Sequence, residues 1–163
     1  LFAPVQDFAR GQGMTDLVYV LNGPNLNMLG VRQPEVYGRQ TLADIEADCR
    51  ARAGSRGLEI DFRQTNSEAE LLGWVHASRG QASAVIINPA AFTHTSIALL
   101  DALLLLDVPV LEVHLSNVHR REAFRRHSYV SQAAQGVICG FGGQSYILAI
   151  DAVASILGNA PEN

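Results

Sequence analysis

Short apolar runs of β type alternate along the chain with segments of helical spacing, and this alternation restricts the fold more than any other feature. Five runs have the length and composition of strands, at residues 17–22, 58–64, 84–88, 109–115 and 136–141. Five helices are predicted from apolar periodicity, at residues 41–52, 67–78, 95–106, 120–127 and 143–157. The alternation predicts an α/β fold with one open, mostly parallel sheet and helices on both of its faces.

Local signals mark the ends of several elements. Thr41 is placed to cap the first helix, and Ser67 with Glu70 has the spacing of a capping box. The stretch G-F-G-G at 140–143 is similar to a phosphate-cradling turn. It lacks the full G-x-G-x-x-G pattern and follows the last strand, so we interpret it as a tight strand-to-helix turn.

The chain has 163 residues, which is enough for one domain with a substantial core. We expect residues 1–13 to be a leader, natural or vector-derived, and residues 14–163 to form the single domain, because Met14 directly precedes the first strand-like run.

No apolar run approaches the ~20 residues that span a membrane. The net charge of −4 argues against nucleic acid as a partner. Cys49 and Cys139 form no disulfide framework and fit a reducing cytoplasm.

All 12 basic residues are arginines, and the chain contains no lysine. A lysine Schiff base, a pyridoxal phosphate enzyme and the lysine of a P-loop are therefore excluded. Any carbonyl chemistry here must proceed without an imine to lysine.

Polar residues follow three of the predicted strands. Asn22, Asn88 and His114 stand at or near the carboxyl ends of their strands. Open α/β sheets bind ligands beyond this edge, where the strand order reverses. The sequence therefore predicts a site there.

The loop after the first strand is longer than an ordinary βα connection. Gly30 and Gly38 bracket a segment that carries Arg32 and Tyr37, which is typical of a hinged lid. A tyrosine, whose pKa is ordinarily near 10, becomes a useful base when a cation stabilises its phenolate. The alternative is a surface loop with a packed tyrosine.

Two further segments carry candidate groups. Asn88 and His94 have the chemistry to hydrogen-bond a polyol, although a turn residue and a helix-start histidine are the plain alternatives. Asp101, seven residues after His94, is predicted on a similar helix face. A carboxylate in so apolar a helix indicates either a core ion pair or a residue that reaches a neighbouring subunit.

Glu112 and His114 alternate along one strand and should point to the same face. A carboxylate beside an imidazole sets its tautomer and supports its charged form, which suits a general acid, although a structural pair is equally consistent. Arginines suited to an anion follow, at 120, 121, 125 and 126, of which Arg120 and Arg126 fit a solvated face. A metal site using His94, Glu112, His114 and His119 is disfavoured, because no metal-binding spacing is present.

Three motifs together resemble the type II 3-dehydroquinate dehydratases. They are N-G-P-N-L-x-x-L-G-x-R-x-P-x-x-Y-G from residue 22, N-x-x-x-x-T-H-T-S from residue 88 and E-V-H-x-S-N-V-H-x-R-E-x-F-R-x-H-S from residue 112. The resemblance covers residues 17–157. It implies a flavodoxin-like, three-layer sandwich with a five-stranded parallel sheet, and a cofactor-free, metal-free lyase of the shikimate pathway. It also implies a homo-oligomer, a dodecamer built as a tetramer of trimers.

The resemblance also implies roles for individual residues. Tyr37 is similar to the base, Arg32 to the group that favours its phenolate, and Asn25 to the residue that supports the enolate oxygen. His114 is similar to the acid, with Glu112 orienting it. The remaining residues are similar to the substrate-binding set: Asn88, His94, Asp101, Leu115, Ser116, Arg125 and Arg121. Two other hypotheses remain at this point, a flavin- or nucleotide-binding module and a ligand-binding protein without catalysis.

Overall fold

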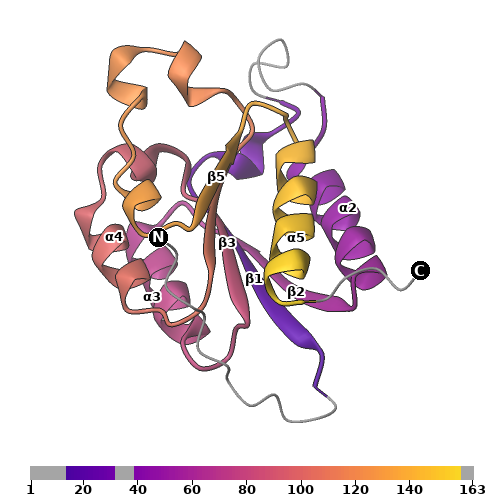
Figure 1. Cartoon of the computed structure of the whole chain (residues 1–163). Coiled ribbons are helices and arrows are strands. Elements are labelled where there is room, and N and C mark those ends of the chain that lie inside the picture. The colour runs from indigo at the N-terminus through magenta and orange to yellow at the C-terminus, as the bar shows by residue number, and fades with distance from the viewer. Residues whose placement is uncertain (1–13, 32–38, 159–163) are drawn as a thin grey trace.

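One parallel sheet forms the centre of the molecule (Figure 1). The computed structural model describes residues 14–31 and 39–158. Five strands pair in the order β2-β1-β3-β4-β5. Their bounds are β1 Asp16–Asn22, β2 Leu58–Gln64, β3 Ala84–Asn88, β4 Val110–His114 and β5 Gly136–Cys139. This is the flavodoxin-like strand order, and the predicted fold class is confirmed.

Helices cover both faces of the sheet. The α-helices within the described residues are α2 Leu42–Ser55, α3 Glu68–Ser78, α4 Ile97–Leu104 and α5 Gln144–Ile156. Figure 1 shows α2 and α5 on one face and α3 and α4 on the other. Because side chains alternate along a strand, Val18 and Val20 pack into the core under α2 and α5, and Tyr19 and Leu21 pack into the opposite core.

The helix predicted at 120–127 is wrong. The chain instead makes two short 3₁₀ turns, η3 Val118–Arg120 and η4 Ala123–Arg125, with extended backbone at Arg121 between them. A helix this short depends on an apolar face packed against the protein, and this basic segment offers none. Elsewhere in the described residues, 3₁₀ turns occur at η1 Leu26–Met28, η2 Ala90–His94 and η5 Val130–Gln132.

The helix predicted at 95–106 is shorter than expected. The preceding turn ends at His94, and Ser96 caps α4 by accepting a hydrogen bond from the backbone N–H of Leu99. Thr41 makes a full capping box with Asp44 at α2, so that predicted cap is confirmed. At α3 only half of the predicted box is present: Ser67 accepts from the N–H of Glu70, but the Glu70 carboxylate bonds the hydroxyl of Thr65 instead.

Gly23 lies where the end of β1 meets the end of β3. Its N–H donates to the carbonyl of Asn88 at 2.8 Å. A Cβ at this position would lie 2.5 Å from the Pro89 carbonyl oxygen and 2.7 Å from its carbon. Both are backbone atoms beside the strand ends, so an added side chain would fit only if the two strand ends moved apart.

Gly23→Ala is therefore expected to lower the free energy of unfolding by about 1–3 kcal/mol, through overpacking of backbone against backbone. Urea denaturation followed by circular dichroism measures it. The matched control is Gly54→Ala in α2, where an added Cβ meets nothing within 4 Å, and where alanine's helix propensity should leave stability unchanged or higher. Equal stability of Gly23→Ala and the wild type would contradict the steric argument.

None of the helices in the described part of the chain has the length and apolar character needed to cross a membrane.

Candidate active site

The carboxyl ends of β1, β3 and β4 bring buried polar residues to one edge of the sheet. Asn22 and Asn88 are register partners at the ends of β1 and β3, and His114 ends β4. All three are buried. The strand order reverses between β1 and β3, so the polar edge coincides with the topological switch point, as predicted.

A pocket with a volume of about 160 Å³ opens above this edge. Most of the predicted site residues line it, namely Asn25, Asn88, His94, His114, Leu115, Ser116, Arg121 and Arg125. Glu112 lies directly behind His114. Arg32 and Tyr37 lie outside the described residues. The structure thus brings together residues from four separate segments of the chain.

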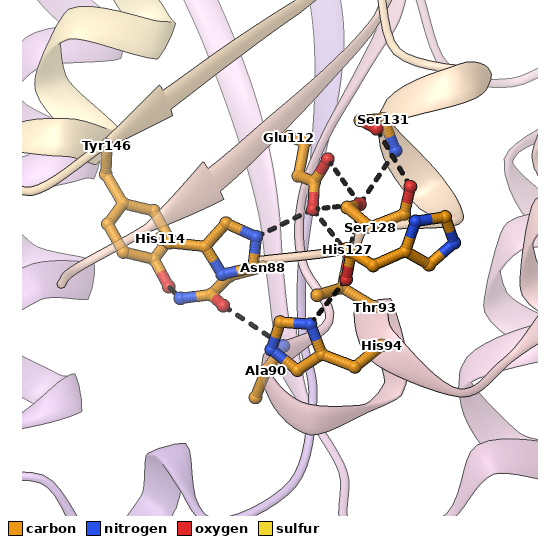
Figure 2. A network of polar contacts seen from close by, with 10 residues as sticks. All are labelled: Asn88, Ala90, Thr93, His94, Glu112, His114, His127, Ser128, Ser131 and Tyr146. Carbon is orange, nitrogen blue, oxygen red and sulfur yellow. Dashed lines mark hydrogen bonds and ion pairs between the residues drawn. The ribbon is translucent and has the colours of Figure 1, made fainter. Parts of the chain in front are cut away.

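Glu112 and His114 share one face of β4, as their spacing predicted, and the imidazole Nε2 lies 2.6 Å from Glu112 Oε1 (Figure 2). Glu112 is fully buried. Thr93 donates to its Oε1 at 2.5 Å, and the Ser128 hydroxyl lies 2.9 and 3.0 Å from its two oxygens. Every neighbour in this cradle can donate a hydrogen bond, so the cradle fits an ionised carboxylate.

The pKa of Glu112 follows from this environment. Burial alone raises the pKa, but hydrogen bonds from His114, Thr93 and Ser128, with the charge of His114, outweigh it and hold the pKa below its usual value. An ionised Glu112 accepts a hydrogen bond from Nε2 of His114. The other ring nitrogen, Nδ1, is then left to the pocket that His114 lines.

His94 is oriented from the opposite side of the pocket. Its Nδ1 lies 2.7 Å from the backbone carbonyl oxygen of His127 (Figure 2). A carbonyl can only accept, so Nδ1 carries a hydrogen. In neutral His94 the remaining nitrogen, Nε2, is an acceptor that suits a hydroxyl group of a bound polyol.

Two of the four arginines face the pocket and two do not. Arg121 and Arg125 are half-buried in its lining, whereas Arg120 and Arg126 are exposed, as expected of a solvated face. The carboxylate of Glu122 lies 3.0 Å from Arg125 and 3.6 Å from Arg121. Glu122 is largely exposed, and such surface pairs are weak. Both guanidinium groups therefore remain suited to an anionic ligand.

The first loop supplies Asn25, which has a left-handed φ of 65°. Its backbone N–H donates to Asn66 Oδ1 at 2.8 Å. Gly30 also has a positive φ, 83°, and a Cβ there would lie 2.9 Å from the Arg39 carbonyl oxygen. The loop therefore leaves the site through a turn that suits glycine. The predicted lid between Gly30 and Gly38 lies almost wholly outside the described residues.

The turn at 140–143 contacts the pocket lining through the backbone of Leu115. Gly140 and Gly142 have positive φ angles of 97° and 57°, and the N–H of Gly142 donates to the Leu115 carbonyl at 2.9 Å. The segment joins β5 to α5. Its interpretation as a strand-to-helix turn is confirmed, and it fixes the backbone that leads to Ser116.

Asp101 does not share a helix face with His94, so that prediction was wrong. His94 belongs to η2, and Asp101 lies on α4 after the cap at Ser96. Asp101 is exposed and absent from the pocket lining, so the interpretation as a core ion pair is also wrong. The other interpretation, a contact with a neighbouring subunit, stays a prediction.

The candidate metal ligands do not form a cluster. Within residues 14–31 and 39–158, no group of three His, Cys, Asp or Glu residues is placed to hold a metal ion. Both oxygens of Glu112 are engaged by the cradle, and His119 is exposed.

Three residues at the site were not predicted from the sequence. Thr93 and Ser128 bond Glu112, and Tyr146, from α5, bonds Asn88. Thr93 and Ser128 fall within the quoted motifs, which was an available signal. Tyr146 lies in an apolar helix, where periodicity marks it only as a core residue.

Comparisons with known proteins agree with this geometry. Residues 16–154 match the family model described as dehydroquinase class II. A relative from Pseudomonas aeruginosa, named 3-dehydroquinate dehydratase 2, is 61% identical over 138 residues, covering 85% of this chain and 93% of its own. A relative of the same name from Agrobacterium fabrum is 58% identical over 134 residues, covering 82% and 91%.

A solved structure of a type II dehydroquinase is also similar to this chain. The crystal structure of type II dehydroquinase from Propionibacterium acnes superposes with a TM-score of 0.84 at 44% identity, covering 87% of this chain and 98% of its own. The family model alone spans most of the chain. With the motifs, the strand order and the Glu112–His114 pair at the switch point, it follows that the chain belongs to the class II dehydroquinase family.

Proposed function

We propose that the protein is a 3-dehydroquinate dehydratase that converts 3-dehydroquinate to 3-dehydroshikimate and water in the shikimate pathway. The observation that carries the proposal is the buried Glu112–His114 pair, which opens into a pocket lined by Arg121 and Arg125. An acid beside an anion-binding surface is what the loss of water from a hydroxy acid requires. Membership of the family supports the same reaction.

The proposed mechanism is an anti elimination through an enolate. Tyr37, as a phenolate supported by Arg32, takes the proton from the carbon next to the ketone. The electron pair moves onto the ketone oxygen, which Asn25 stabilises, with a water between them. His114, as an imidazolium, protonates the departing hydroxyl; the enolate collapses, the carbon–oxygen bond breaks, and water and the conjugated enone are released.

The other residues bind the substrate in this proposal. Arg125 and Arg121 are suited to its carboxylate, because guanidinium groups pair with carboxylates in bidentate geometry. Asn88, His94 and the backbone at Leu115 and Ser116 are suited to its hydroxyl groups. No cofactor is needed for these steps.

The test is the ultraviolet absorbance of the enone. Purified protein is incubated with 3-dehydroquinate in a buffer that contains a chelator and no cofactor. Continuous growth of the enone absorbance is expected. Absence of turnover at high protein concentration would overturn the proposal, and nucleotide- or flavin-dependent thermal stabilisation would instead favour a binding module.

We also propose a homo-oligomer, a dodecamer of four trimers, in which Asp101 enters the site of an adjacent subunit. Ile97, Leu104 and Leu105 on or next to α4 are 56%, 61% and 57% exposed in the single chain. Large exposed apolar groups around Asp101 are consistent with a surface that a neighbouring subunit covers.

We also propose a cytoplasmic location, which the two free cysteines support. Cys49 is buried, and burial raises the pKa of its thiol to about 12.

Complementation between two inactive variants tests the role of Asp101. Asp101→Ala and His114→Ala are each expected to lose most activity. Co-expressed, they should regain activity at about a quarter of the sites, because random mixing pairs an intact His114 with a neighbour's intact Asp101 at that frequency. Mixed oligomers without regained activity, or a fully active monomer in light scattering, would contradict this role.

A further inference from the structure

Three buried polar side chains form a row beneath the pocket. Asn22 ends β1, Asn88 ends β3, and Tyr146 comes from α5 to stand between them. The Tyr146 hydroxyl lies 2.6 Å from Asn22 Oδ1 and 2.8 Å from Asn88 Nδ2. Of the three, Asn88 lines the pocket and the other two do not.

The surroundings of Asn22 determine which group donates and which accepts in each hydrogen bond of this row. Asn22 Nδ2 lies 2.9 Å from the carbonyl oxygen of Arg63 and 3.4 Å from that of Val20. Backbone carbonyls only accept, so the amide nitrogen of Asn22 must face them. Its oxygen therefore faces Tyr146.

The orientation of Asn22 in turn determines where the hydroxyl hydrogen of Tyr146 points. Its side chain is fully buried, and burial raises the pKa of its hydroxyl, which therefore stays protonated. The amide oxygen of Asn22 only accepts, so the single hydroxyl proton goes to it. The hydroxyl oxygen is then left as an acceptor, and the group of Asn88 that meets it must be the Nδ2 donor (Figure 2).

The orientation of Asn88 follows. Its Oδ1 accepts from the N–H of Ala90 at 3.2 Å, and one hydrogen of Nδ2 goes to Tyr146. For the second hydrogen of Nδ2, the described part of the chain offers no acceptor, while the side chain lines the pocket. A buried N–H without a partner is costly, so this hydrogen is suited to an oxygen acceptor in the pocket, a water oxygen in the free protein or an oxygen of a bound ligand.

We propose that Asn22 and Tyr146 are positioning residues that hold the Asn88 amide with an Nδ2 hydrogen directed into the pocket, as a donor to a substrate oxygen. The inference rests on the proposed function, since the oxygen belongs to 3-dehydroquinate. Asn88 then recognises an oxygen that can accept, such as a hydroxyl or carboxylate oxygen, and disfavours a group that can only donate at that point. Tyr146 and Asn22 act only through Asn88.

Tyr146→Phe removes the hydroxyl and keeps the ring packed beside Phe62. The Asn88 amide then keeps only the long bond from the Ala90 N–H to orient it, so it can turn its oxygen to the substrate more easily. We expect the KM for 3-dehydroquinate and the Kd of 3-dehydroshikimate to rise about tenfold, with kcat within about twofold of the wild type, because the lost contact serves ground and transition states alike. Asn22→Ala breaks the row at its other end and should give the same split.

A double-mutant cycle separates positioning from general damage. If Tyr146 acts through Asn88, Tyr146→Phe should change neither KM nor Kd further in an Asn88→Ala background. Ile150→Val, one turn along α5 and equally buried, is the control for loss of packing. It should lower the melting temperature and leave both constants unchanged.

The results are distinguishable. Effects of Tyr146→Phe and Asn88→Ala that multiply, or a change of KM in Ile150→Val equal to that in Tyr146→Phe, would overturn the positioning role while the proposed function stands. Should Tyr146→Phe not fold, the cycle with Asn22→Ala decides in the same way. A wild type that turns over no 3-dehydroquinate overturns both proposals.

Discussion

Glu112→Gln is expected to lower kcat by about 10²–10⁴-fold while the fold persists, the range that a positioned general acid contributes. Glutamine has the same shape, but it carries no charge to support the imidazolium form of His114. It also places an NH₂ group among the donors of Thr93, Ser128 and His114. Steady-state kinetics at saturating 3-dehydroquinate measure the loss, with circular dichroism as the check on folding.

The pH dependence has a definite sign. The folded-state pKa of Glu112 lies below its ordinary value, so ionised Glu112 stabilises the fold above the unfolded pKa of about 4.3. That contribution to stability is lost as the pH falls through the folded-state pKa.

Thr93→Val removes one donor to Glu112 and should raise the pKa of its carboxyl group. The acid limb of the kcat–pH profile should therefore move to higher pH.

If Glu112→Gln kept the wild-type kcat, the Glu112 carboxylate would have no part in catalysis and only a structural role. An acid limb of Thr93→Val that stays in place would show that the cradle does not control the charge of Glu112. Ser131 bonds Ser128 but not Glu112. Ser131→Ala is therefore the matched control, and its pH profile should follow the wild type.

Tyr37→Phe is expected to reduce kcat by about 10²–10⁴-fold and to leave the melting temperature unchanged. Phenylalanine keeps the ring but has no oxygen to take the proton beside the ketone. The variant should also lose the exchange of that proton with deuterium from the solvent. Enone formation and mass spectrometry of recovered substrate measure the two effects.

Tyr19→Phe is the control for loss of a tyrosine hydroxyl. Tyr19 is buried in the core under α3 and α4, and its hydroxyl bonds Gln81 at 2.9 Å, away from the pocket. Its kcat should match the wild type. Near-normal turnover by Tyr37→Phe would exclude Tyr37 as the base and move the search to another group near the pocket.

The sequence determined the features that depend on neighbouring residues. The period of apolar residues sets whether a segment forms a strand or a helix, so the sheet and its flanking helices were predictable. Glu112 and His114 share a face because they are two residues apart on a strand. Asn22, Asn88 and His114 converge because parallel strands end at one edge.

Only the tertiary structure decided the features that join distant residues or that depend on packing. Tyr146 meets Asn22 across 124 positions, and Ser128 reaches Glu112 from the irregular segment between η4 and η5, just after the residues 120–127 that periodicity had assigned to a helix. Asp101 was separated from His94 by the cap at Ser96. A hydrogen bond between remote side chains requires both backbones to be placed to within a few tenths of an ångström, and that placement is a property of the packed core, which no local pattern encodes.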